Sequence, residues 1–147
     1  MSAAELLARR SAAALLAGDR VARALGIEVV DVGPGHATAR MRVTESMLNG
    51  VGTVHGGVVF SLADIAFGIA CNSHGQLTVS RSAEVIHVAA AHAGETLVAA
   101  AVERSRRGRN GVYDVTVCRA EGGVVAEFRA QSRSLDGRLV PDEDGGG

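Results

Sequence analysis

The segment from Gly57 to Cys71 most constrains what this 147-residue chain can fold into, because it is apolar on every face of a helix. A helix that is hydrophobic all round belongs inside a core rather than on a surface. Its only side chain that is charged at neutral pH is Asp64. A lone carboxylate in apolar surroundings is costly unless it is hydrogen-bonded, paired or solvated by a pocket. Asp64 is therefore the first candidate for chemistry.

The composition is that of one ordinary domain, 1–147, with a core of small and β-branched side chains. The formal net charge of -1 leaves no electrostatic footprint for nucleic acid or for an anionic membrane surface. The central apolar run is shorter than the roughly 20 residues of a membrane span, and it contains a carboxylate. We therefore expect a cytoplasmic protein with no nucleic-acid partner and no membrane contact.

The hydrophobic pattern predicts an α+β fold. Residues 1–25 form a helical segment that Gly18 can break, and residues 136–147 form an acidic, glycine-rich tail that we expect to be disordered. A turn at 33–35 separates two predicted strands. The predicted strands cover 27–32, 37–44, 77–89, 96–104, 112–120 and 124–134.

The order α-β-β-α-β-β-β-β predicts an antiparallel sheet wrapped around the long central apolar helix. The connectors between the last four strands suit an antiparallel meander. Such a sheet has two open edges, so we expect it to pair with a second copy of the chain.

The motif around the central helix is specific. It reads Asn49-x5-His55-Gly56-Gly57-x2-Phe60-x-Leu62-Ala63-Asp64-x-Ala66-Phe67, and Gly111-Val112-Tyr113-Asp114-Val115 follows later in the chain. In residue types and spacings the chain resembles the hotdog-fold thioesterases of the phenylacetyl-CoA thioesterase group, over about residues 20–135.

This resemblance implies a dimer, often paired into a homotetramer, with sites at the subunit interface. It also implies hydrolysis of an acyl-CoA thioester without a metal or redox cofactor. The acyl group is expected to be aromatic, such as phenylacetyl or hydroxyphenylacetyl, or of short or medium length. Many relatives carry a Phe-x-Arg-Pro segment after the long strand, whereas this chain reads Val88-Ala89-Ala90-Ala91-His92-Ala93, so the acyl pocket can differ here.

Asp64 can act as a general base toward water or as a direct nucleophile, since a carboxylate can form a covalent acyl intermediate. It can instead be a buried structural acid. Gly56 and Gly57 come at the expected start of the central helix, where free N–H groups can bind an oxyanion. The resemblance assigns polarisation of the thioester carbonyl to the Gly56 N–H. A plain loop-to-helix glycine pair is the structural alternative.

Two further residues accompany this motif. His55 can position the helix start, cap it or touch substrate, whereas Asn49 can orient water or the carbonyl, or hold its loop. A basic hairpin covers 104–110. Its guanidinium groups can bind the phosphates of CoA, or the hairpin can simply be a solvated turn. The candidates there are Arg106, Arg107, Arg109 and Asn110.

The remaining histidines of interest, His74, His87 and His92, have no ligand spacing, so we assign them no site and expect no metal. A non-catalytic acyl-CoA-binding protein is one alternative function, but a sensor usually needs an output domain, and the N-terminal helical segment is too small for a DNA-binding module. A hotdog enoyl-CoA hydratase or dehydratase is another. It would need an Asp and His pair, for which the chain offers Asp31 and His36.

Overall fold

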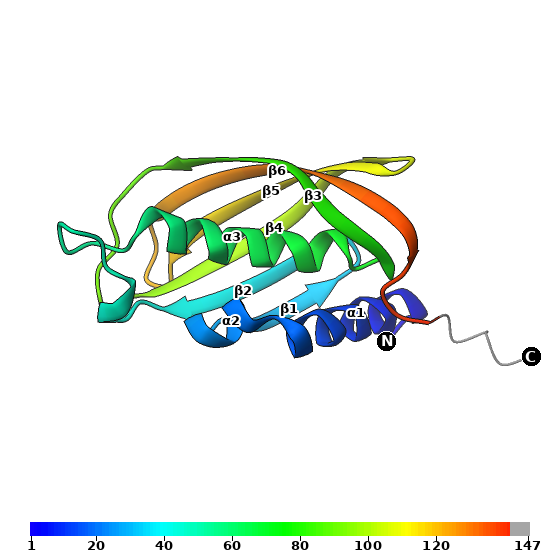
Figure 1. The fold of residues 1–147 in the computed structure, drawn as a ribbon, viewed down its shortest axis with the longest axis horizontal. Helices are drawn as coiled ribbons and strands as arrows, with labels where there is room; N and C mark the ends of the chain where they lie inside the picture. Colours follow the sequence, from blue (N-terminus) through cyan, green and yellow to red (C-terminus); the bar gives the residue numbers. More distant parts are fainter. Residues whose placement is uncertain (142–147) are drawn as a thin grey trace, which may run out of the picture.

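The computed structural model describes residues 1–141 (Figure 1). Three α-helices, one short 3₁₀ helix and six strands follow one another in the predicted order. They are α1 (Ala3–Gly18), α2 (Arg20–Leu25), β1 (Glu28–Gly33), β2 (His36–Arg42), η1 (Glu45–Met47), α3 (Gly56–Cys71), β3 (Gln76–His87), β4 (Thr96–Arg107), β5 (Asn110–Arg119) and β6 (Val124–Arg138). Within residues 1–141, no helix combines the length and hydrophobicity needed to cross a bilayer.

The N-terminal helical segment breaks at Gly18, where the sequence allows it. Helix α1 begins with a capping box, in which Ser2 Oγ accepts the Glu5 N–H and the Glu5 carboxylate accepts the Ser2 N–H. After Gly18 the chain turns, and Asp19 caps α2 by accepting the Ala22 N–H at 2.9 Å. Two capped helices therefore replace one continuous helix.

The predicted antiparallel sheet forms, but its strand order is β1-β2-β4-β5-β6-β3. The expected four-strand meander holds only for β4, β5 and β6. Strand β3 lies at the far edge beside β6, with Val85 opposite Phe128, rather than beside β4. The place beside β4 is taken by β2, whose residues pair from His36 with Val102 to Arg42 with Thr96. The connector between β3 and β4 is therefore a crossover and not a hairpin.

The last strand also reaches further than predicted. Strand β6 continues to Arg138, so residues 136–138, which were expected to begin a disordered tail, belong to the sheet. Val140 beyond it is buried. The end of the predicted tail, 142–147, lies outside the described residues.

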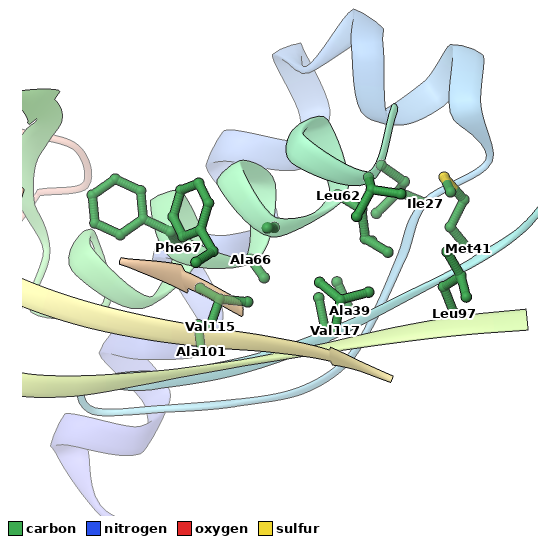
Figure 2. Close-up of a cluster of buried hydrophobic side chains, with 14 of the residues drawn as sticks. Ile27, Ala39, Met41, Leu62, Ala66, Phe67, Leu97, Ala101, Val115 and Val117 are labelled. Atoms are coloured by element: carbon green, nitrogen blue, oxygen red, sulfur yellow. The ribbon is translucent and has the colours of Figure 1, made fainter. Parts of the chain in front are cut away.

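Helix α3 lies across one face of the sheet, which curls around it (Figure 1). The strand residues that face it are small, including Ala39, Ala101 and Val115, and all are at most 1% exposed. Figure 2 shows Leu62, Ala66 and Phe67 of α3 pointing toward these strands. The Phe67 ring meets the Tyr113 ring edge-on, with the two centroids 5.5 Å apart. The core thus forms between one helix face and the concave face of the sheet.

The expectation that α3 is buried on every face is wrong for the single chain. The residues Gly57, Ser61, Asp64 and Gly68 recur at helical spacing, and none of them is fully buried. A methyl group added at Gly68 would meet no atom within 4 Å. We call these four residues the open stripe of α3. Apart from the carboxylate its side chains are very small, so another surface can approach the helix backbone closely.

The packing of Phe67 predicts a large effect of truncation. Phe67 is 1% exposed and lies against the rings of Tyr113 and Phe128. Phe67→Ala should lower the free energy of unfolding by about 3–5 kcal/mol, because it removes buried apolar surface and leaves a cavity. Chemical denaturation at one fixed protein concentration measures this. Val51→Ala, at a side chain that is 85% exposed, is the control, and an equal loss in both variants would contradict the packing.

Candidate active site

The start of α3 leaves a single backbone donor available. The side chain of His55 caps the helix, with Nδ1 accepting the Gly57 N–H at 3.0 Å. The His55 carbonyl oxygen accepts the N–H groups of Val58 and Val59. Within residues 1–141, the Gly56 N–H has no hydrogen-bond acceptor. The sequence indicated both Gly56 and Gly57 as candidate donors. Gly56 has the free N–H, whereas the N–H of Gly57 is bonded to His55.

Asn49 holds the loop that leads into α3. Its side-chain oxygen accepts the N–H groups of Val51 at 3.0 Å and Thr53 at 3.2 Å, and its side-chain nitrogen donates to Thr53 Oγ1 at 3.0 Å. The connection between β2 and α3 is also closed on itself, because the His55 N–H donates to the Met47 carbonyl. These bonds fit the loop-holding alternative for Asn49 and fix the position from which α3 starts.

A cavity of about 380 Å³ lies at this end of α3. Its lining includes Asn49 and Gly56 together with His87, a residue whose sequence spacing indicated no site. Apart from Thr53, the rest of the wall is small and apolar, and includes Val59, Ala89, Ala90 and Val125. The segment after β3 reaches this place because the Val54 N–H donates to the Ala91 carbonyl. No local pattern predicts the contact, since it joins residues 37 positions apart.

Asp64 lies in the open stripe of α3, half-buried and without a hydrogen-bond or ion-pair partner among residues 1–141. Burial raises the pKa of its carboxyl group, and the negative charge of Asp19 raises this pKa further. Ser61, one turn earlier, donates to the Gly57 carbonyl at 2.9 Å. The carboxylate is thus free of any structural bond that would explain its presence in an apolar helix.

The structure does not bring Asp64 and Gly56 together within one chain. They are eight residues apart on the same helix, which corresponds to about 12 Å along the helix axis. Asp64 is not part of the cavity wall that contains Gly56. One thioester carbonyl cannot contact both groups of a single copy.

The basic hairpin lies at the opposite end of α3, where β4 joins β5 (Figure 1). Arg106, Arg109 and Asn110 line a second hollow of about 170 Å³, together with Cys71 at the end of α3. Arg109 pairs with Asp136 at 2.7 Å, and Asn110 accepts a hydrogen bond from Arg81.

Arg107, in the same hairpin, is exposed. Because Gly56 and Cys71 are the two ends of α3, roughly 22 Å separate this hairpin from the Gly56 cavity along the helix. The predicted CoA-binding residues and the predicted oxyanion donor therefore do not meet in one chain.

The Asp and His pair considered for hydratase chemistry does meet, but at another place. His36 Nδ1 lies 3.7 Å from Asp31 Oδ2 in the β1–β2 hairpin, with side chains that are 47% and 65% exposed. Neither residue lines the cavity at Gly56. Among residues 1–141, no group of three or more His, Cys, Asp or Glu side chains is arranged to hold a metal ion.

The class of protein follows from comparison with known proteins. Residues 51–126 match the sequence model of the Thioesterase superfamily. Acyl-coenzyme A thioesterase PaaI of Escherichia coli K12 is 39% identical over 131 residues, covering 89% of this chain and 94% of that protein. The solved structure of E. coli PaaI matches with a TM-score of 0.89 at 38% identity, covering 91% of this chain and 97% of that one.

A third likeness is to a Streptococcus mutans protein solved with acetyl CoA. It matches with a TM-score of 0.73 at 25% identity, covering 76% of this chain and 90% of that one. Together with the sheet curled around α3, these matches define the class. The chain belongs to the Thioesterase superfamily and is a thioester hydrolase with a hotdog fold.

The surroundings of Asp64 predict the pH dependence of this hydrolase. If the ionised carboxylate is the reacting form, kcat/KM falls as pH falls through a pKa above the usual range of aspartate. Asp19→Asn removes the negative charge that contributes to this shift, so the acid limb should move to lower pH. Asparagine caps a helix as well as aspartate does, so α2 should persist.

The measurement is kcat/KM against pH for both proteins with one acyl thioester. Glu28→Gln is the control. It removes the carboxylate on β1 that pairs with Arg40 on β2, and it should leave the acid limb of the pH profile in place. An acid limb that Asp19→Asn does not move, or moves to higher pH, would contradict the assignment of the limb to Asp64.

Proposed function

We propose that this chain hydrolyses acyl-CoA thioesters to a free acid and CoA, with the Gly56 N–H and the Asp64 carboxylate as the reacting machinery. The observation that carries the proposal is that one helix holds both groups. The Gly56 N–H is an unbonded donor beside a cavity, and Asp64 is a half-buried carboxylate without a partner among residues 1–141. A relative named for acyl-CoA thioesterase activity and a solved neighbour bound to acetyl CoA support the choice of thioester.

The acyl group we propose is apolar. The cavity wall beside Gly56 consists largely of alanine and valine side chains, which suit an aromatic group or a short or medium aliphatic chain. The E. coli relative comes from an operon for phenylacetic acid degradation. Phenylacetyl-CoA and hydroxyphenylacetyl-CoA are therefore the first substrates to test.

The chemistry can follow two routes, which share the carbonyl donor. In one, Asp64 takes a proton from water as the water oxygen bonds to the carbonyl carbon, and the carbonyl electrons move to the oxygen held by the Gly56 N–H. Collapse of this intermediate breaks the C–S bond, and the CoA thiolate takes the proton back from Asp64. In the other route Asp64 itself attacks, CoA leaves, and water hydrolyses the resulting anhydride.

A second copy of the chain completes the site in this proposal. Asp64 of one copy would face Gly56 of the other, because about 12 Å separates the two groups within a copy. The open stripe of α3 supports such a contact, since Gly57, Ser61 and Gly68 let two helices approach closely. Strand β3 supports it too, because it is an unpaired edge of the sheet.

The same arrangement explains the distant arginines. If two α3 helices run antiparallel with Asp64 of one opposite Gly56 of the other, the Cys71 end of the second helix lies beyond the first copy's Gly56. The second copy's basic hairpin then approaches the CoA phosphates, with Arg106, Arg107, Arg109 and Asn110 as their ligands. We propose a dimer or a dimer of dimers that works in the cytoplasm without a metal or redox cofactor.

The first test is release of free thiol, read with a colorimetric reagent, from acetyl-, hexanoyl-, palmitoyl-, benzoyl- and phenylacetyl-CoA. Asp64→Asn should lower turnover by about 10²-fold or more, because the base or nucleophile is lost. Ser61→Ala, in the same stripe one turn away, is the matched control and should change turnover little.

Stability separates lost chemistry from lost folding in this test. The pKa of Asp64 is raised in the folded protein, so ionisation of this group costs stability as pH rises from the unfolded pKa through the folded one. Asp64→Asn should therefore have a Tm at pH 7 equal to or above that of the wild type. Near-wild-type turnover of Asp64→Asn, or no thiol released from any ester by the wild type, would overturn the proposal.

A mixing experiment tests the shared site. Gly56→Pro removes the donor but suits the helix, because proline is favoured at the first helical position and His55 already has extended backbone angles of φ -63° and ψ 133°. Gly56→Pro and Asp64→Asn should each be inactive alone. Refolded together, they should regain about one quarter of wild-type activity, since half of the random pairs are mixed and each holds one intact site.

Gly56→Ala is the control in this experiment, because it adds a side chain and keeps the N–H. It should retain more activity than Gly56→Pro. If mixed pairs form, as shown by co-purification through a tag on one variant, and yet no activity returns, the two groups do not act across an interface.

A further inference from the structure

His87, at the end of β3, places its imidazole directly over the Gly56 backbone. A Cβ built on Gly56 would lie 3.0 Å from His87 Nε2 and 3.2 Å from His87 Cε1. Both residues line the cavity of about 380 Å³ at the start of α3. The absence of a side chain at Gly56 is thus what leaves room for the ring.

The distance between the two nitrogens suits a shared acceptor. The amide nitrogen of Gly56 is about 2.5 Å from its own Cβ position by standard geometry, so it can be no more than about 5.5 Å from His87 Nε2. Two hydrogen bonds of about 2.9 Å to one oxygen can span up to about 5.8 Å. An oxygen bound to the Gly56 N–H is therefore within reach of the imidazole.

His87 is also the one unengaged polar side chain of this cavity wall. The other two polar side chains that line it, Asn49 and Thr53, are bonded to each other within their loop. Within residues 1–141 the His87 side chain has no hydrogen-bond or ion-pair partner, and it is exposed at the cavity wall. In the neighbouring segment, the N–H groups of Val88 and Ala89 are already used, because both donate to the Val125 carbonyl.

We propose that His87 donates a second hydrogen bond, from Nε2–H, to the thioester carbonyl oxygen held by the Gly56 N–H. This inference rests on the proposed function. A neutral imidazole carries one N–H and needs no proton transfer to act in this way. The donor stabilises the negative charge that develops on the oxygen as the carbonyl carbon is attacked, so it contributes mainly to kcat rather than to substrate binding.

The experiment compares His87→Phe and His87→Gln with the wild type, using the acyl-CoA that the wild type hydrolyses fastest. His87→Phe keeps a flat ring without a donor, and kcat should fall by about 10²-fold while KM changes by only a few-fold. His87→Gln restores an N–H donor, so its kcat should lie clearly above that of His87→Phe. His92→Phe is the matched control, because His92 is exposed in the connector that follows β3 and does not line the cavity.

Three outcomes would overturn the proposal. A kcat of His87→Phe within twofold of the wild type removes any role for the donor. An equal loss of kcat in His87→Phe and His87→Gln indicates that His87 shapes the cavity and does not act as a hydrogen-bond donor. A rise in KM without a fall in kcat assigns His87 to substrate binding. Each is distinct from failure of the proposed function, in which the wild type itself releases no Asp64-dependent thiol.

Discussion

The close packing of α3 against the concave face of the sheet is the contact on which the rest of the structure depends. It is possible because the strand residues beneath the helix are alanine and valine, with Ala39 and Ala99 fully buried. Small side chains on the sheet let Leu62 and Phe67 of the helix pack in one buried cluster with the strand side chains (Figure 2). The position of the helix in turn sets the position of both groups that the proposed chemistry needs.

One helix therefore carries two different electrostatic environments. At its first residue, Gly56 has a backbone N–H with no acceptor among residues 1–141, at the positive end of the helix dipole. Two turns later, Asp64 is a carboxylate whose pKa is raised by burial and by Asp19. A helix is stiff, so the separation between them cannot close by side-chain movement. The rigidity that holds each group in place also makes a single copy incomplete as a catalyst in the mechanism we propose.

Much of the local structure could be predicted from the sequence. The central helix begins at Gly56, as the motif indicated, and the N-terminal segment breaks at Gly18. These features follow from short-range causes, such as helix capping, hydrophobic period and turn-forming residues. The place of β3 beside β6 was not predicted. An alternating pattern predicts that a segment is a strand and which of its faces is buried, but it does not predict which strand lies beside it.

The candidate site divides in the same way. The sequence by itself singled out Asp64 as the candidate acid, because it is the one charge in an apolar helix, and it placed a glycine pair at the helix start. Only the tertiary structure decided which glycine has a free N–H, since His55 bonds to Gly57 and leaves Gly56 open. It also decided that His87 lies over Gly56, through the crossover from β3 to β4. Residue types and helix starts are local properties of the chain, whereas contacts between distant segments depend on which strands pair and where the connections cross.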